Sequence, residues 1–81
     1  MTLEEAKKLV MVILSDRKNY SKSLNYAVGY CQYFMTIDNE EEARVQALYI
    51  LNNLSSWRHE RAKEVRDGLK KFAKLKTKKR R

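Results

Sequence analysis

The chain contains no proline and only two glycines, Gly29 and Gly68, among its 81 residues. Both residue types mark strand ends and tight turns, so their scarcity disfavours a sheet-rich fold. Apolar residues instead recur every three or four positions, which is the spacing of one helix face. Hydrophobic residues make up 43% of the chain, enough for a globular domain. We therefore expect an all-α protein.

The apolar periodicity predicts four helices. They cover about residues 3–14, about 20 or 21 to 35, from a cap at Asp38 to about 54, and about 57–74. Thr2 with Glu5, and Asp38 with Glu41, have the spacing of helix-capping pairs. No glycine or proline forces a stop between the last two segments, so they can also form one long bent helix.

The short connections favour antiparallel neighbours, so we expect a compact bundle of three to four helices. We expect the bundle to be a single helical domain over residues 1–75. Residues 76–81 have no apolar periodicity, and we expect a disordered basic tail there.

Positive charge gathers in the last part of the chain. Residues 57–81 hold twelve of the eighteen lysines and arginines but only three of the ten acidic residues. The candidate nucleic-acid-binding residues are Arg58, Arg61, Lys63, Arg66, Lys70, Lys71, Lys74, Lys78, Lys79, Arg80 and Arg81. Cations in such a cluster bind phosphates and release counterions, with little sequence preference. Two alternatives remain open: a solvated helix with a solubilising tail, or a surface for an acidic protein partner. Pairs such as Glu60–Lys63 and Asp67–Lys71 favour the solvated helix.

A second feature is a stripe of tyrosines on one side of the second predicted helix. Tyr26, Tyr30 and Tyr33 follow helical spacing on the side opposite the main apolar face, and Gly29 lies on the same side. The glycine would let another backbone approach there. The stripe has three interpretations: part of the core, a protein interface that includes self-association, or a platform on which bases of single-stranded nucleic acid stack.

The sequence contains no pattern typical of catalysis. It has no Ser/His/Asp arrangement, no glycine-rich phosphate loop and no metal-ligand spacing. We expect Trp57 to cap the core, Cys31 to be a small buried group and His59 to lie at the surface. The protein is therefore expected to be non-enzymatic, with no cofactor, no metal and no small-molecule substrate.

The longest apolar run, residues 9–14, is far shorter than the roughly 20 residues that span a bilayer. The acidic start of the chain is not typical of a secretory signal. We therefore expect no membrane partner and a cytoplasmic location.

Residues 48–70 resemble the end of small bacteriophage-encoded proteins of unknown function. The resemblance consists of an aromatic-Leu-Asn-Leu stretch, then Trp57-Arg58, then an amphipathic basic helix. It implies a location in the host cytoplasm and a small accessory role. Together with the charge, it predicts a non-enzymatic nucleic-acid-binding accessory protein. The alternative is a protein-interaction module, an inhibitor or adaptor of a host or viral protein, that uses the tyrosine stripe.

Overall fold

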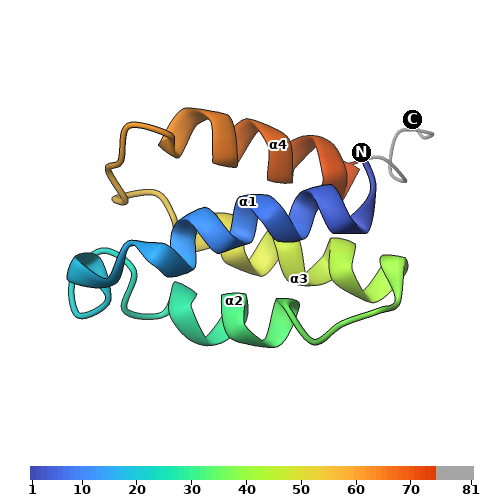
Figure 1. The fold of residues 1–81 in the computed structure, drawn as a ribbon, viewed down its shortest axis with the longest axis horizontal. Coiled ribbons are helices and arrows are strands. Elements are labelled where there is room, and N and C mark those ends of the chain that lie inside the picture. Colours follow the sequence, from blue (N-terminus) through green and yellow to red (C-terminus); the bar gives the residue numbers. More distant parts are fainter. Residues whose placement is uncertain (75–81) are drawn as a thin grey trace.

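The protein is a bundle of four α-helices in the computed structural model, which describes residues 1–74 and has no strand in that range. The helices are α1 (Leu3–Ser15), α2 (Ala27–Phe34), α3 (Glu40–Asn52) and α4 (Ala62–Lys74), and a short 3-10 helix, η1 (Arg17–Asn19), follows α1. Successive helices run antiparallel, and both α1 and α3 pack between α2 and α4 (Figure 1). The predicted all-α bundle is thus confirmed. The predicted basic tail, 76–81, lies outside the described residues.

Polar side chains cap the starts of α1 and α3. The Thr2 hydroxyl accepts a hydrogen bond from the Glu5 N–H at 3.2 Å, and the Glu5 carboxylate accepts one from the Thr2 N–H at 2.9 Å. This is the predicted capping box, and it satisfies donors that have no partner inside the helix. At α3 the predicted cap, Asp38, is wrong by one position. Asn39 has the extended backbone of a cap, and its side-chain oxygen accepts from the Glu42 N–H at 2.9 Å.

The helix α2 begins later than predicted, because residues 20–26 form successive turns instead of a helix. The Leu24 N–H donates to the Asn19 carbonyl at 3.0 Å, and Leu24 is fully buried. The Tyr20 hydroxyl donates to the carbonyl of Leu14 in α1. Serine and asparagine are frequent in this segment, and their side chains compete with helical backbone bonds. The turns therefore tie the connection to α1 and shorten α2.

A loop of residues 53–61 separates α3 from α4, so the interpretation as one long bent helix is wrong. Trp57 in this loop is buried, and its indole N–H donates to the Asp16 carboxylate at 2.8 Å. The Arg66 guanidinium donates to the carbonyls of Leu54 at 3.4 Å and Trp57 at 3.2 Å. These long-range bonds hold the loop out of helical conformation, and α4 therefore begins later than the predicted position 57.

The core lies between the four helices. The rings of Phe34 in α2 and Phe72 in α4 meet edge to face with their centres 6.3 Å apart. Trp57 and Cys31 are buried, as predicted. A Cβ on Gly68 would lie 2.3 Å from Leu9 Cδ1, so this glycine allows the close approach of α4 to α1. The residues fully buried by side chain include Ile13, Leu24, Ile50, Leu54, Leu69 and Val65.

Candidate binding surface

Most acidic residues of the first three helices gather at one end of the bundle. Because α1 and α3 run in the same direction, their first turns lie at the same end (Figure 1). This acidic end consists of Glu4, Glu5, Asp38, Glu40, Glu41 and Glu42. These are all the acidic residues before position 57 except Asp16. The carboxylates stabilise the positive ends of the two helix dipoles. Because α4 runs antiparallel to α3, its last turns with Lys70 and Lys71 reach the same end, so exposed carboxylates and lysines are both present there.

The other end of the bundle, which we call the basic end, gathers cations from two connections. The connection between α1 and α2 provides Arg17, Lys18 and Lys22. The connection between α3 and α4, with the start of α4, provides Arg58, Arg61 and Lys63. All six side chains are exposed. The hydrogen bond between Asp16 and Trp57 joins these connections. Glu60 and Glu64 are the exposed acidic residues within 16–26 and 53–64. Positive charge is thus in excess over this surface.

Arg17, Lys18 and Lys22 are not among the predicted site residues. Their segment belongs to the near-neutral part of the chain, residues 1–56. The total charge of that part does not show that its acidic residues and these cations lie at different positions in the fold. A local signal does exist, since three cations occur within six positions, 17–22, with no acidic residue among them. The sequence does not show that this segment meets residues 53–61.

Two of the predicted cations on α4 pair with acids of the same helix. Arg61 binds both carboxylate oxygens of Glu64 at 3.0 Å, and Lys63 binds Asp67 at 3.0 Å. These pairs replace the predicted Glu60–Lys63 and Asp67–Lys71 pairs. They lower the pKa of Glu64 and of Asp67, since the hydrogen bond from the cation stabilises the carboxylate. Exposed pairs of this kind contribute little to stability, so phosphates can compete for the cations.

The other predicted cations of α4 differ in their surroundings. Arg66 is half-buried and donates to two backbone carbonyls, so its first role is to hold the loop before α4. The side chains of Arg58, Lys70 and Lys71 are exposed and make no hydrogen bond or ion pair with any residue of the range 1–74. Lys74 is the last residue of α4. The remaining four, Lys78, Lys79, Arg80 and Arg81, lie outside the described residues.

A buried hydrogen-bond cluster links the two connections that form the basic end. The Asp16 carboxylate is 6% exposed and accepts from the Trp57 indole and from the Asn19 amide, both at 2.8 Å. The hydrogen bond from Trp57, then that from Asn19, lower the pKa of Asp16. The His59 ring stacks on Trp57 with centres 5.3 Å apart, and its Nδ1 accepts from the Arg61 N–H at 3.0 Å. These contacts fix the loop that presents Arg58.

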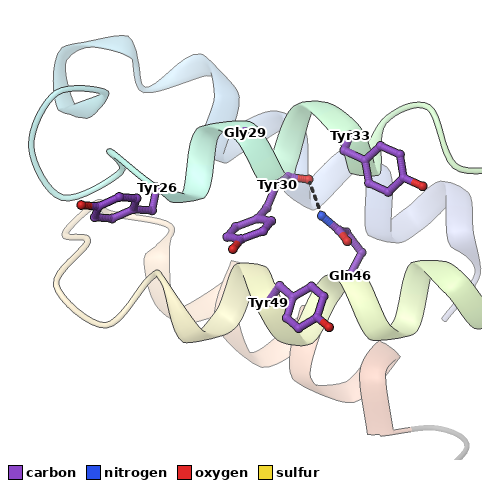
Figure 2. A pocket seen from close by; sticks show the side chains of 6 residues that line it. All are labelled: Tyr26, Gly29, Tyr30, Tyr33, Gln46 and Tyr49. Atoms are coloured by element: carbon purple, nitrogen blue, oxygen red, sulfur yellow. Dashed lines mark hydrogen bonds between the residues drawn. The ribbon is translucent and has the colours of Figure 1, made fainter.

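The predicted tyrosine stripe is exposed, so its interpretation as part of the core is wrong. The exposed fractions of Tyr26, Tyr30 and Tyr33 are 73%, 39% and 49%. The stripe lines a groove between α2 and α3 with a volume of about 490 Å³, together with Gly29, Gln46 and Tyr49 (Figure 2). We call this the tyrosine groove. The stripe remains outside the core because α2 buries a different face, which carries Ala27, Cys31 and Phe34.

The α3 side of the tyrosine groove does not follow from the sequence pattern. The rings of Tyr30 and Tyr49 lie with centres 5.7 Å apart, and the Gln46 amide donates to the Tyr30 carbonyl at 3.3 Å (Figure 2). The sequence signal for an exposed Tyr49 is that it does not share the helix face of the buried residues Ala43, Ala47 and Ile50. The Tyr33 hydroxyl donates to the Glu42 carboxylate, and this hydrogen bond raises the pKa of Tyr33.

Gly29 does not play its predicted role. A Cβ built on Gly29 would meet no atom within 4 Å, so no backbone approaches it within the described structure. The glycine instead leaves the floor of the tyrosine groove open.

Residues 1–74 hold no group of three or more His, Cys, Asp or Glu side chains placed to bind a metal ion. Within the same range, no helix has the length and hydrophobicity needed to cross a bilayer. Comparisons of the chain with family models, with curated proteins and with solved structures each gave no match.

Proposed function

We propose that this protein is a small non-enzymatic accessory protein that binds nucleic acid through phosphate contacts, with little sequence specificity. The contacts come from α4, from the basic tail and from the basic end of the bundle. The resemblance of residues 48–70 to small bacteriophage proteins extends this proposal to a phage-encoded protein that acts in the host cytoplasm.

One observation carries the proposal: exposed cations along α4 and at the basic end outnumber the acids beside them. Arg58, Lys70 and Lys71 have no ion pair within residues 1–74. Arg61 and Lys63 are engaged only in exposed pairs. Residues 76–81 add five more lysines and arginines. Clustered cations of this kind attract a polyanion over a distance and bind it by counterion release.

The salt dependence of binding to duplex DNA tests the proposal. Each phosphate neutralised contributes about 0.9 to the slope of log K against log salt. Removal of residues 76–81 should lower the slope by roughly 4 to 5 if all five cations contact phosphates. Lys70→Gln and Lys71→Gln should each lower it by about 0.9.

Lys8→Gln is a matched control, because Lys8 is an exposed lysine on α1 that belongs neither to the basic end nor to α4. Its slope should equal that of the wild type. Failure of the full chain to bind any nucleic acid at low salt would sink the proposal. Equal slopes for Lys8→Gln and Lys70→Gln would show that binding follows net charge and not this surface.

A further inference from the structure

We infer that the tyrosine groove and the basic end form one continuous track for single-stranded nucleic acid. Bases stack on the tyrosines, and phosphates lie against the cations. This inference rests on the proposed function and deepens it, because it names the form of nucleic acid that the surface recognises.

The track is continuous because its three hollows share residues. A middle hollow of about 270 Å³ lies between the connections 20–26 and 53–56 and shares Tyr26 with the tyrosine groove. The same middle hollow shares Ser55 with a third hollow of about 380 Å³, beside the start of α4. A chain that enters at Tyr30 therefore passes Tyr26 and Ser55 before it reaches α4.

The tyrosine groove supplies surfaces for stacking. It is lined by four tyrosines. The side chain of Tyr26, the most exposed of them, makes no hydrogen bond or ring contact within the described residues. The floor at Gly29 is open. Any base has an aromatic face that can stack on such a ring, so the groove accepts bases without selecting among them.

The middle hollow supplies polar groups for base edges. The side chains of Asn25 and Asn52 are exposed and make no hydrogen bond within residues 1–74. The Ser23 hydroxyl is buried and has no hydrogen-bond partner in that range. Lys22 lines the same hollow and can meet a phosphate. Amides and hydroxyls both donate and accept, so they suit several bases.

The charge of the third hollow favours an anionic occupant such as a phosphate backbone over an apolar protein face. Arg58, Lys63 and Arg66 line it, with Glu60 as its acidic residue. An apolar protein face would bury these cations against no opposite charge, whereas phosphates supply it. At the opposite end of the tyrosine groove, the Glu42 carboxylate accepts a hydrogen bond from the Tyr33 hydroxyl. The negative charge of Glu42 repels phosphate at this end of the groove. The strand therefore extends from Tyr30 towards α4.

The form of the nucleic acid follows from the tyrosines. Bases in a duplex are stacked and paired inside the helix, so their faces are closed to protein side chains. Bases of a single strand are free to stack on aromatic rings. A duplex can therefore use the cations of this track but not its tyrosines.

The experiment compares single-stranded DNA of about 12 nucleotides with a duplex of the same length, by fluorescence anisotropy at low salt. Tyr26→Ala should weaken single-strand binding about fivefold or more, while Tyr26→Phe, which keeps the ring, should leave it within about twofold. Duplex binding should not change with either variant. Met11→Ala is the control, because Met11 is an exposed apolar side chain on α1, outside the three hollows.

A second variant fills the tyrosine groove instead of emptying it. Gly29→Leu should preserve the fold, because its Cβ meets no atom within 4 Å and leucine favours a helix more than glycine does. Its larger side chain should weaken single-strand binding by a similar factor and spare duplex binding.

The outcomes separate this inference from the proposed function. Unchanged single-strand binding in both Tyr26→Ala and Gly29→Leu, with duplex binding intact, would overturn the track and leave the proposed function standing. Loss of both kinds of binding in the wild type would remove the proposed function itself. If Gly29→Leu instead abolishes a dimer seen by light scattering and leaves single-strand binding intact, the tyrosine groove is a protein interface and the inference is wrong.

Discussion

Replacing Asp16 by asparagine should destabilise the fold by about 2 kcal/mol at neutral pH. Asp16 is buried, and one of its carboxylate oxygens accepts from both the Trp57 indole and the Asn19 amide at 2.8 Å. Asp16→Asn keeps the shape and an acceptor oxygen but removes the charge. The variant therefore measures what the ionised carboxylate adds to the junction between α1 and the loop before α4.

The magnitude follows from the two hydrogen bonds. A hydrogen bond to a charged group contributes about 1.5–3 kcal/mol, and a neutral one about 0.5–1.5 kcal/mol. Each bond should therefore lose about 1 kcal/mol. In a domain of this size, 2 kcal/mol lowers the melting temperature by roughly 8–16 °C.

The contribution of Asp16 should depend on pH. Its folded-state pKa is lowered from the ordinary value of 3.8, so the folded state prefers the ionised carboxylate. The added stability is present above that ordinary value and is lost as the pH falls through the folded-state pKa. The difference between wild type and Asp16→Asn should thus be constant from about pH 5 to pH 8 and should shrink towards pH 3.

Urea unfolding followed by circular dichroism, at pH 7 and at pH 3, provides the assay. A double-mutant cycle with Trp57→Phe, which removes the indole donor, isolates the contact between the two side chains. A difference of the same size at both pH values would refute the role of the ionised carboxylate. A coupling energy near zero in the cycle would refute the contact itself.

Further predictions concern the two glycines, the cysteine and the loop. Gly29→Ala should raise the free energy of unfolding by about 0.5–1 kcal/mol, because the site is helical and open. Gly68→Val should lower it by about 1–3 kcal/mol by crowding Leu9, and thermal melts of both variants check the contrast. Burial raises the pKa of Cys31 to about 12, so a thiol reagent at pH 8 should react with it only after unfolding. Arg66→Gln should cost about 1 kcal/mol in urea unfolding, because it weakens the bonds to the loop carbonyls; a cost near zero would contradict that role.

The sequence by itself determined the helical class, most of the buried faces and the local cap of α1. Positions three and four apart lie on one side of any helix, so Val65, Leu69 and Phe72 were identifiable as a core stripe before any packing was known. The Thr2–Glu5 cap closes within one turn and depends on nothing distant. The excess of cations after position 57 is likewise a property of the chain alone.

The tertiary structure decided where α2 and α4 begin and which side chains share a surface. The Asp16–Trp57 hydrogen bond joins residues 41 positions apart. The two connections that carry Lys22 and Arg58 lie at the same end of the bundle (Figure 1). Tyr49 completes the tyrosine groove only because α3 packs beside α2. Local propensity acts over a few residues, whereas these placements depend on buried contacts between segments that meet only after the bundle has formed.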